Sequence, residues 1–250
     1  MHRFHLPVEN WESATLPAEE SHHCVNVMRL AANERITVFD GAGREAAAVI
    51  VEANSKGVVL KVSNAAKTLP PPCSITLVQA VPKGKNMDLI VQKAVELGAS
   101  SIAPILSDRT VVQLDAAELE KKRSKWQEVA LEACKQCGQN HLPTVAKPCS
   151  PKEFFERADR KELMLIASLQ PDARPLKAVL ADFVSTNSRL PRSVIVLVGP
   201  EGDFTPAELS LAKSNGCIPI TLGPIILRTE TAAIYCLSVL AHELFSPTNP

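Results

Sequence analysis

The spacing of hydrophobic and polar positions changes near residue 70 of this chain. Before that point, short apolar runs alternate with turns rich in Gly, Asn, Asp and Ser, a pattern typical of short strands. Strands are expected at 36–39, 47–51 and 58–62. A helix is expected over 19–30, where apolar residues recur at helical spacing. Strands this short favour a small β-barrel.

A proline run interrupts the pattern at 68–72, with the sequence Thr-Leu-Pro-Pro-Pro. Proline cannot donate to a sheet ladder and favours extended backbone, so such a run suits a linker. We therefore expect one domain at 1–70 and a second at 73–250.

After the prolines, strands and helices alternate. Strands are expected at 74–81, 101–106, 163–167, 194–198 and 218–222, and helices at 87–97 and 116–137. Alternation of this kind predicts an α/β domain with a mostly parallel sheet covered by helices.

The first of two informative turns follows the apolar strand 194–198 and reads Gly199-Pro200-Glu201-Gly202-Asp203-Phe204. A helix start comes next, because Thr205 and Glu208 form a capping box around Pro206. Ligands of open α/β sheets bind at the carboxyl ends of strands, where the carboxylate of Glu201 could act on one. From these residues alone, a plain tight turn is an equally good interpretation.

The second turn, 222–228, is unusual because it is apolar in its middle, with Ile225, Ile226 and Leu227. We expect its backbone to be buried against other loops or a ligand, and its walls would suit an adenine ring. Arg228 and Glu230 open the last helix; a solvated helix start is at least as good an interpretation of each as catalysis. Neither a G-x-G-x-x-G nor a P-loop motif is present in the sequence.

Composition narrows the function classes. The 250 residues are 46% apolar and 22% charged, and 27 basic residues balance 27 acidic ones, which argues against bulk non-specific nucleic-acid binding. No apolar run is long enough for a membrane span, and the polar N-terminus does not suit a signal peptide, so a cytoplasmic location is expected. Seven scattered cysteines fit reduced thiols.

Cys134-x-x-Cys137 followed by His141 invites a zinc interpretation. A second cysteine pair is missing nearby, so we expect buried small side chains and no metal. Cys24 and Cys217 are expected in the core.

Several separate motifs, in order along nearly the whole chain, carry a resemblance to a known family. They are Arg3-Phe4, the run 22–30, Phe39-Asp40-Gly41, Pro82-Lys83-Gly84-Lys85 with Met87-Asp88, the run 92–98, Gly199-Pro200-Glu201-Gly202 and the run 226–232. The chain resembles the bacterial 16S ribosomal RNA uridine-N3 methyltransferases of the SPOUT superfamily.

The resemblance implies a PUA-like RNA-binding barrel followed by an α/β domain with a deep trefoil knot, acting as a homodimer on 16S rRNA or the small ribosomal subunit. S-adenosylmethionine would bind in the knot. The residues implied for that cofactor are Leu197, Val198, Gly199, Pro200, Glu201, Gly202, Leu222, Gly223, Ile226, Leu227, Arg228, Thr229, Thr231 and Ala232. Those implied for RNA are Arg3, Arg29, Lys83, Lys85 and Arg109.

Methyl transfer to uridine N3 needs a base or cations that stabilise the imidate anion. Arg228 is the candidate for the anion, and Glu201 or Glu230 is the candidate base or orienting group. Two rival functions stay open: methylation of another RNA site, and a non-catalytic RNA-binding assembly module.

The chain departs from the family pattern at four positions. Asp203 stands where the family usually has Gly and Ile225 where it often has Arg, while Lys135 and Gln139 replace the typical Glu and Arg. If that Arg holds RNA in the family, another cation must do so here, and Lys135 is the candidate.

Overall fold

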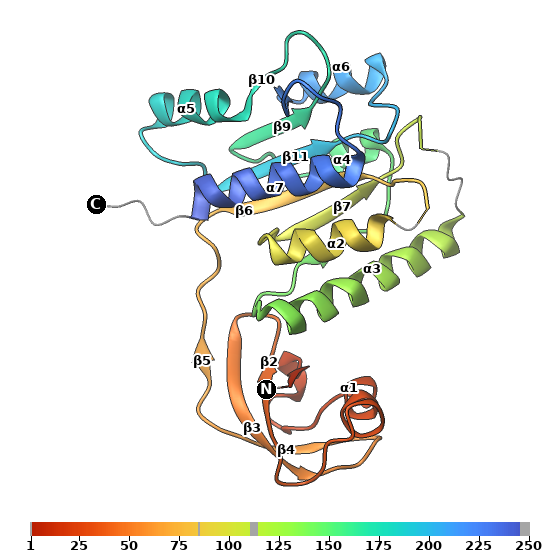
Figure 1. Cartoon of the computed structure of the whole chain (residues 1–250), viewed down its shortest axis with the longest axis vertical. Coiled ribbons are helices and arrows are strands. Elements are labelled where there is room, and N and C mark those ends of the chain that lie inside the picture. Colours follow the sequence, from red (N-terminus) through yellow and green to blue (C-terminus); the bar gives the residue numbers. More distant parts are fainter. Residues whose placement is uncertain (1, 85, 111–114, 246–250) are drawn as a thin grey trace. The chain divides into compact units, whose positions relative to one another are not determined.

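The computed structural model describes residues 2–84, 86–110 and 115–245, which form two compact units (Figure 1). The first unit comprises Met1–Pro70 and Leu131–Leu142, and the second comprises Pro71–Ala130 and Pro143–Pro250. The sequence prediction divided the chain once, at the prolines. It did not foresee that residues 131–142 belong to the first unit.

The first unit is mainly β-structure. Its elements are β1 (Arg3–His5), η1 (Val8–Asn10), α1 (Ala18–His22), η2 (His23–Val27), β2 (Arg35–Phe39), β3 (Arg44–Glu52), β4 (Val59–Val62) and β5 (Ala66–Lys67). The strands form one sheet in the order β1-β2-β3-β4, and β5 pairs with β3. Alternation along β2 buries Ile36 and Val38 in a core with Phe4 and Ile50.

The three strands predicted in this unit are confirmed, each within a few residues. The predicted helix at 19–30 is shorter than expected: α1 ends at His22 and continues as a π-helix, η2. Arg29 then takes a left-handed backbone with a φ of 57°. Cys24 is buried as predicted.

The second unit is built on a parallel sheet, as predicted. Its strands are β6 (Ser74–Ala80), β7 (Ser101–Ile105), β8 (Thr144–Val145), β9 (Leu163–Ala167), β10 (Arg174–Pro175), β11 (Ser193–Val198) and β12 (Ile218–Thr221). In the described residues their order is β10-β12-β9-β11-β6-β7-β8, and each neighbouring pair is parallel.

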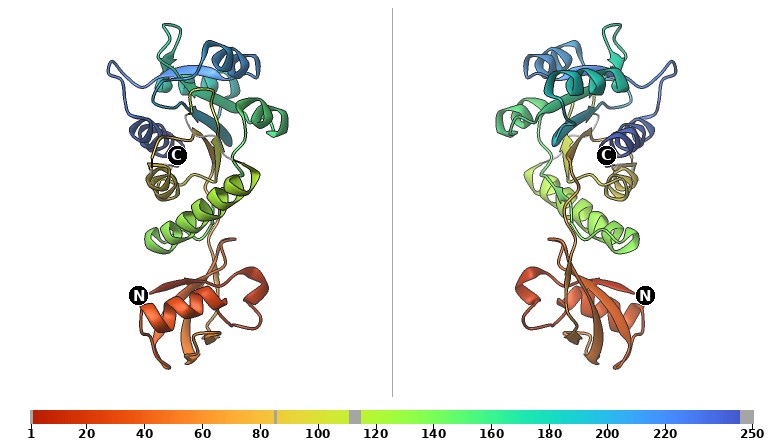
Figure 2. Two further views of the ribbon diagram at one scale, coloured as in Figure 1. Left: turned by 90° about the vertical axis from the view of Figure 1, so that its right-hand side faces the viewer. Right: turned by 90° about the vertical axis from the view of Figure 1, so that its left-hand side faces the viewer.

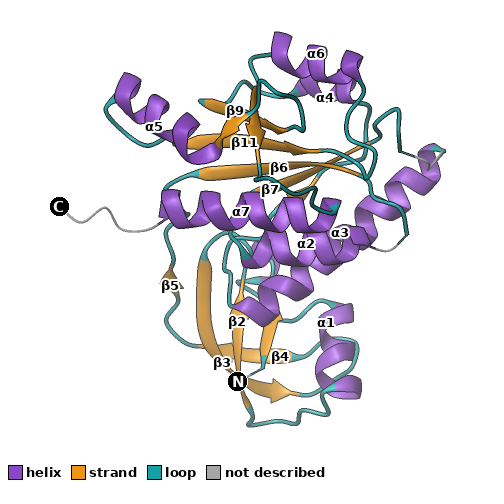
Figure 3. Ribbon diagram, turned by 45° about the horizontal axis from the view of Figure 1, so that its top comes forward, coloured by secondary structure: helices purple, strands orange, loops and turns teal. Residues whose placement is uncertain are grey.

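Helices cover both faces of this sheet (Figures 2 and 3). They are α2 (Asn86–Glu96), α4 (Pro151–Arg157), α5 (Leu176–Asn187), α6 (Pro206–Ser214) and α7 (Thr229–Phe245), while α3 (Ala116–Cys137) runs from this unit into the first. Phe154 of α4 and Leu209 of α6 pack on Val78, Ile105 and Leu197 of the sheet. The helices α2 and α7 pack against each other, and α7 contacts β6 and β11.

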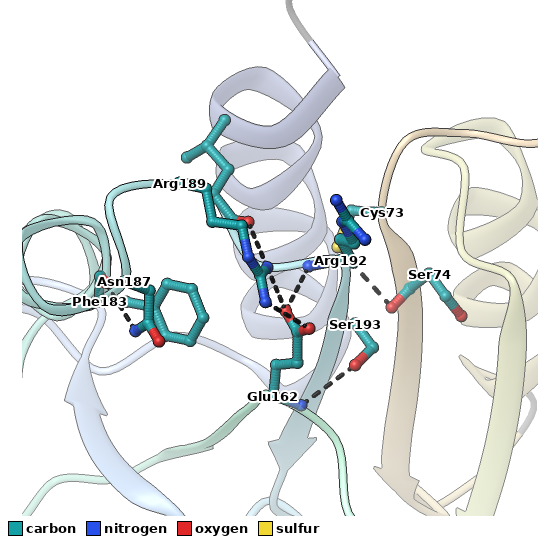
Figure 4. A network of polar contacts seen from close by, with 9 residues as sticks. Cys73, Ser74, Glu162, Phe183, Asn187, Arg189, Arg192 and Ser193 are labelled. Atoms are coloured by element: carbon teal, nitrogen blue, oxygen red, sulfur yellow. Dashed lines mark hydrogen bonds and ion pairs between the residues drawn. The ribbon is translucent and has the colours of Figure 1, made fainter.

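Parallel strands bring all their carboxyl ends to one edge of the sheet and their amino ends to the other. At the amino ends, Glu162, the residue before β9, binds the segment that leads into β11 (Figure 4). Its two carboxylate oxygens accept hydrogen bonds from Arg189 at 2.8 and 2.9 Å, and the Arg192 backbone N–H donates to it at 2.8 Å. The hydrogen bonds from Arg189 and Arg192 lower the pKa of Glu162 to about 2.

None of the helices within the described ranges is long and apolar enough to cross a membrane. The trefoil knot stays a prediction of the family resemblance.

Candidate methyl-donor pocket

The first turn, at residues 199–204, joins β11 to α6 at the carboxyl edge of the sheet. The predicted capping box is confirmed, because Thr205 Oγ1 accepts the Glu208 N–H at 3.3 Å and Glu208 Oε2 accepts the Thr205 N–H at 2.8 Å. Asp203 has a left-handed φ of 61°, and its Oδ1 accepts the Phe204 N–H at 2.8 Å. Glycine is the easiest residue at such a φ and Asp is tolerated there, which accounts for this departure from the family pattern.

The second turn, at residues 222–228, joins β12 to α7. Gly223 has a φ of 122°, a conformation that residues with a side chain rarely adopt. Within the described part of the single chain, other loops do not cover this turn, since Ile225 and Ile226 are 70% and 79% exposed, so of the two expected partners a ligand is left. Their side chains lie along the mouth of a hollow, where solvent reaches them.

The hollow lies between these two turns and the end of β9, and its volume is about 570 Å³ including the open mouth. It is lined by Ala167, Ser168, Leu169, Val198, Gly199, Pro200, Glu201, Asp203, Leu222, Gly223, Ile225, Ile226, Leu227, Thr229 and Ala232. Mainly apolar walls with a few polar groups are typical of small-molecule and cofactor sites. The residues present therefore fit a cofactor with one flat apolar part.

Most of the predicted cofactor residues line this hollow. Those that do not are Leu197, Gly202, Arg228 and Thr231. Leu197 is buried in the sheet core, and Arg228 is exposed at the start of α7.

The sequence prediction missed the third wall, made by residues 167–169 after β9. Ser168 is buried, and its N–H donates to the Ile220 carbonyl at 3.0 Å. The strand 163–167 was predicted correctly, so the rule that ligands bind at the carboxyl ends of parallel strands could have found this wall.

A hydrogen bond ties the two turns together. The hydroxyl of Thr229, the first residue of α7, donates to the Gly199 carbonyl at 2.7 Å. Both residues line the hollow, so this bond helps to set the separation of its two walls.

Two predicted RNA cations lie beside the first turn. The Lys83 backbone N–H donates to Glu201 Oε1 at 3.1 Å, and the Arg109 guanidinium donates to the Gly202 carbonyl. The Arg109 loop is held by the buried carboxylate of Glu208, which accepts the Asp108 N–H at 2.9 Å. The structure thus brings Lys83, Arg109 and Glu201 together, which sequence spacing could not show.

The remaining polar candidates differ in position. Arg228 is exposed and Glu230 is half-buried at the start of α7, and neither lines the hollow. Arg29 is exposed in the first unit. Lys85 lies outside the described residues.

Arg3 and Lys135, two candidate RNA contacts, both form polar contacts within the first unit. The Arg3 side chain is 10% exposed, lies over the Phe39 ring and donates to Glu45 and Asn140. The Lys135 side chain is 8% exposed. It carries ion pairs to Glu20 and Glu132.

Burial favours the neutral amine of Lys135, but hydrogen bonds to Glu132 and Glu20 outweigh this and raise its pKa. Lys135 is therefore a buried, paired cation that cannot reach a phosphate without breaking both pairs. Gln139 contributes its backbone carbonyl as an acceptor for Arg3.

Both cysteines were predicted to be buried. Cys134 is buried, whereas Cys137 is exposed at the end of α3. Burial raises the pKa of the Cys134 thiol to about 12, so this group stays protonated at neutral pH. Among the described residues, no group of three or more His, Cys, Asp or Glu side chains could hold a metal ion. Cys217 is buried as predicted.

Comparison with known proteins decides the family. Residues 69–241 match the model of an RNA methyltransferase domain, and residues 16–63 match that of an RNA methyltransferase PUA domain. The chain belongs to this RNA methyltransferase family. The first unit of this RNA methyltransferase is therefore PUA-like, and the predicted α/β class with a mostly parallel sheet is confirmed.

Individual relatives agree with the family match. The RNA methyltransferase is 31% identical over 241 residues to ribosomal RNA small subunit methyltransferase E of Bacillus subtilis, covering 94% of this chain and 92% of the relative. The crystal structure of the enzyme of the same name from Neisseria gonorrhoeae, bound to S-adenosyl methionine, is 30% identical with a TM-score of 0.84, covering 99% of this chain and 100% of that one. A Legionella pneumophila protein solved with bound SAM is 31% identical with a TM-score of 0.86, covering 97% and 98%.

Proposed function

We propose that this RNA methyltransferase transfers a methyl group from S-adenosylmethionine to N3 of a uridine in 16S rRNA of the small ribosomal subunit. The observation that carries the proposal is the hollow between residues 199–203 and 222–229. Its position at the carboxyl ends of parallel strands suits a nucleotide-like cofactor. Relatives of the same fold, with about 30% identity, are solved with this cofactor, and several are named small-subunit rRNA methyltransferases.

The two turns would hold the cofactor. Ile226 and Leu227 would form an apolar wall against its adenine, and backbone groups near Gly199 and Gly223 would approach it closely because neither residue carries a side chain. The bound cofactor supplies a methyl group on a sulfonium, a good leaving group. The protein's task is then mainly to align donor and acceptor.

The acceptor needs activation, since uridine N3 carries a proton at neutral pH and is a weak nucleophile until that proton leaves. Glu201 is the proposed base. Its Oε1 is oriented by the Lys83 backbone N–H, and its Oε2 would take the N3 proton. Arg228, exposed at the start of α7, would stabilise the negative charge that then develops on the uracil ring. Glu230 would orient Arg228.

The RNA must present its uridine unpaired, because N3 lies on the Watson–Crick edge. Lys83 and Arg109 would contact phosphates next to the flipped base, and Arg29 would contact RNA on the PUA-like unit. Lys85 and Arg3 stay in this proposal from the family resemblance alone, and Arg3 would have to exchange its ion pair with Glu45 for a phosphate.

We also infer a homodimer, as the family resemblance implies. The exposed apolar residues Leu169, Ile225 and Ile226 around the hollow are consistent with cover by a ligand or a second subunit. An enzyme that modifies ribosomal RNA works where ribosomes are assembled, and we therefore propose a cytoplasmic location.

The test is methyl transfer from labelled S-adenosylmethionine to RNA. Purified protein is incubated with 16S rRNA, assembled small subunits and, as a control, 23S rRNA. We expect label in the 16S molecule, in one or both of its forms. Label in 23S rRNA alone would support the rival in which another RNA is methylated. Cofactor binding without transfer to any RNA would support the non-catalytic assembly module.

A further inference from the structure

Gln79 is a buried polar side chain beside the hollow that neither the sequence prediction nor the proposed chemistry uses. It lies near the carboxyl end of β6, where it pairs in register with Val198 of β11. Its exposed fraction is 0% and it does not line the hollow itself. It is therefore placed to act on the pocket only through a neighbour.

That neighbour is Thr229. Gln79 Nε2 donates to the Thr229 hydroxyl at 3.0 Å and to the Ala80 carbonyl at 2.9 Å, so both hydrogens of the amide are used. The Thr229 hydroxyl has a single hydrogen, and it goes to the Gly199 carbonyl at 2.7 Å. The hydrogen bonds thus run in one direction, from Gln79 through Thr229 to Gly199.

The direction is fixed by chemistry. The opposite orientation of the Gln79 amide would place Oε1 against the Ala80 carbonyl, and two acceptors cannot form a hydrogen bond. In the observed orientation, Oε1 is buried and has no hydrogen-bond partner within the described part of the chain. An unpaired buried acceptor lowers stability, which partly offsets the stabilisation from the two hydrogen bonds of the amide. The glutamine thus keeps one buried oxygen unpaired while its nitrogen holds the Thr229 hydroxyl.

The position of the second turn depends on the hydrogen bonds at its two ends. Residues 223–226 are exposed, so the protein around them restrains them little. At one end, Thr221 Oγ1 and Gly223 lie within 3.4 Å of each other. At the other end, Thr229 binds the first turn, and Gln79 holds the Thr229 hydroxyl in place for that bond.

We propose that Gln79 is a positioning residue of the methyl-donor pocket, which acts through Thr229 to hold the two turns at the separation that the cofactor requires. This inference rests on the proposed function, because the ligand is the S-adenosylmethionine of that proposal. A pocket held in its binding geometry before the ligand arrives loses less conformational entropy on binding.

The experiment is calorimetry of S-adenosylmethionine with the full-length protein and four variants. Gln79→Leu is expected to weaken binding about tenfold, equivalent to about 1.4 kcal/mol. The melting temperature of its ligand-free form should change by less than about 3 °C. Thr229→Val should weaken binding at least as much, and Thr229→Ser, which keeps the hydroxyl, should restore it. Adding Gln79→Leu to Thr229→Val should cause no further loss.

A matched control is Thr76→Val, three residues before Gln79 on the same strand and outside the lining of the hollow, which removes the 2.8 Å hydrogen bond to Ser101. It should leave cofactor binding unchanged. Wild-type affinity in Gln79→Leu, or additive losses in the double variant, would overturn the positioning role. If Gln79→Leu does not fold, equal binding by Thr229→Val and Thr229→Ser would overturn it. Failure of the wild-type protein to bind the cofactor would instead refute the proposed function, and the inference with it.

Discussion

Charged side chains around the hollow differ in whether hydrogen bonds within the protein fix their position. Glu201 is exposed, but a backbone N–H fixes one of its oxygens. Arg109 is fixed by its bond to Gly202, within a loop that Glu208 stabilises. Arg228, the residue before α7, is exposed. A residue that is exposed before substrate binds and acts only in the transition state should affect transfer more than cofactor binding.

Arg228→Ala tests this distinction. We expect S-adenosylmethionine to bind with nearly wild-type affinity, because Arg228 does not line the hollow. Methyl transfer should fall by roughly 10²–10³-fold, the range found when one charge-stabilising donor is removed. The measurements are calorimetry and single-turnover transfer. Arg157→Ala, a 71% exposed arginine on α4, is the control. Unchanged turnover would remove Arg228 from the mechanism.

The least predictable feature of the site was which cationic side chains are paired inside the protein. Lys135 and Arg3 carry the charge that RNA binding needs, yet both are paired inside the first unit. Their partners Glu20 and Asn140 are 115 and 137 positions away in the sequence. Local spacing contains no information about such contacts, whereas local turn chemistry correctly predicted the capping box at Thr205.

At the scale of elements, the strands of four or more residues were predictable, whereas the helices α4 and α5 and the shortest strands were not. The strands β5, β8 and β10 have two residues each, so their existence depends on a partner strand. The tight turns are set by backbone geometry. One of these is at Gly43, where the N–H donates to Asn140 and the carbonyl accepts from Thr68.

Gly43→Ala should destabilise the first unit. Gly43 has a φ of 103°, and a Cβ there would lie 2.8 Å from the Thr68 carbonyl oxygen, so the backbone must shift. We expect a loss of about 1–3 kcal/mol or more. Gly57→Ala is the control, since its Cβ would meet Thr15 at an ordinary 3.5 Å and should change stability by less than about 0.5 kcal/mol.

Urea unfolding in a Trp126→Phe background measures both glycine variants, because Trp11 then reports on the first unit alone. Equal unfolding midpoints for Gly43→Ala and Gly57→Ala would contradict the close contact at Gly43.

Glu162 predicts a pH dependence at the amino ends of the strands. Its pKa is about 2 in the folded protein against an ordinary 4.5, so the carboxylate stabilises the fold above about pH 4.5. That contribution is lost as the pH falls from about 4.5 through about 2. The melting temperature of Glu162→Gln should therefore lie below that of wild type at pH 6 and approach it at pH 3. Glu156→Gln, at a 60% exposed carboxylate, should show no such convergence. A difference that is constant with pH would contradict the assignment.

At the scale of the whole molecule, the parallel sheet was predictable and its order was not. The order β10-β12-β9-β11-β6-β7-β8 keeps β6, β7 and β8 side by side but separates the later consecutive strands, such as β11 and β12, and periodicity cannot decide which strands become neighbours. The same limit applies to residues 131–142, where α3 passes from one unit to the other along an unbroken helical pattern. The trefoil knot and the dimer came only from the family resemblance.

The dimer is tested by light scattering of the full-length protein. We expect a mass of twice 27.0 kDa, unchanged by dilution through the low micromolar range. Ile225→Asp and Ile226→Asp report whether the exposed turn lies in the interface. A monomer that transfers methyl groups at full rate would contradict the homodimer.

The proposed reaction transfers a methyl group from the cofactor in the pocket to N3 of a uridine. Its most direct test is mass spectrometry of nucleosides digested from 16S rRNA after reaction with deuterated-methyl S-adenosylmethionine. We expect labelled 3-methyluridine, and far less of it with the Arg228→Ala variant at the same short reaction time. Label on a ribose, on another base, or on carbon 5 of uracil would contradict it.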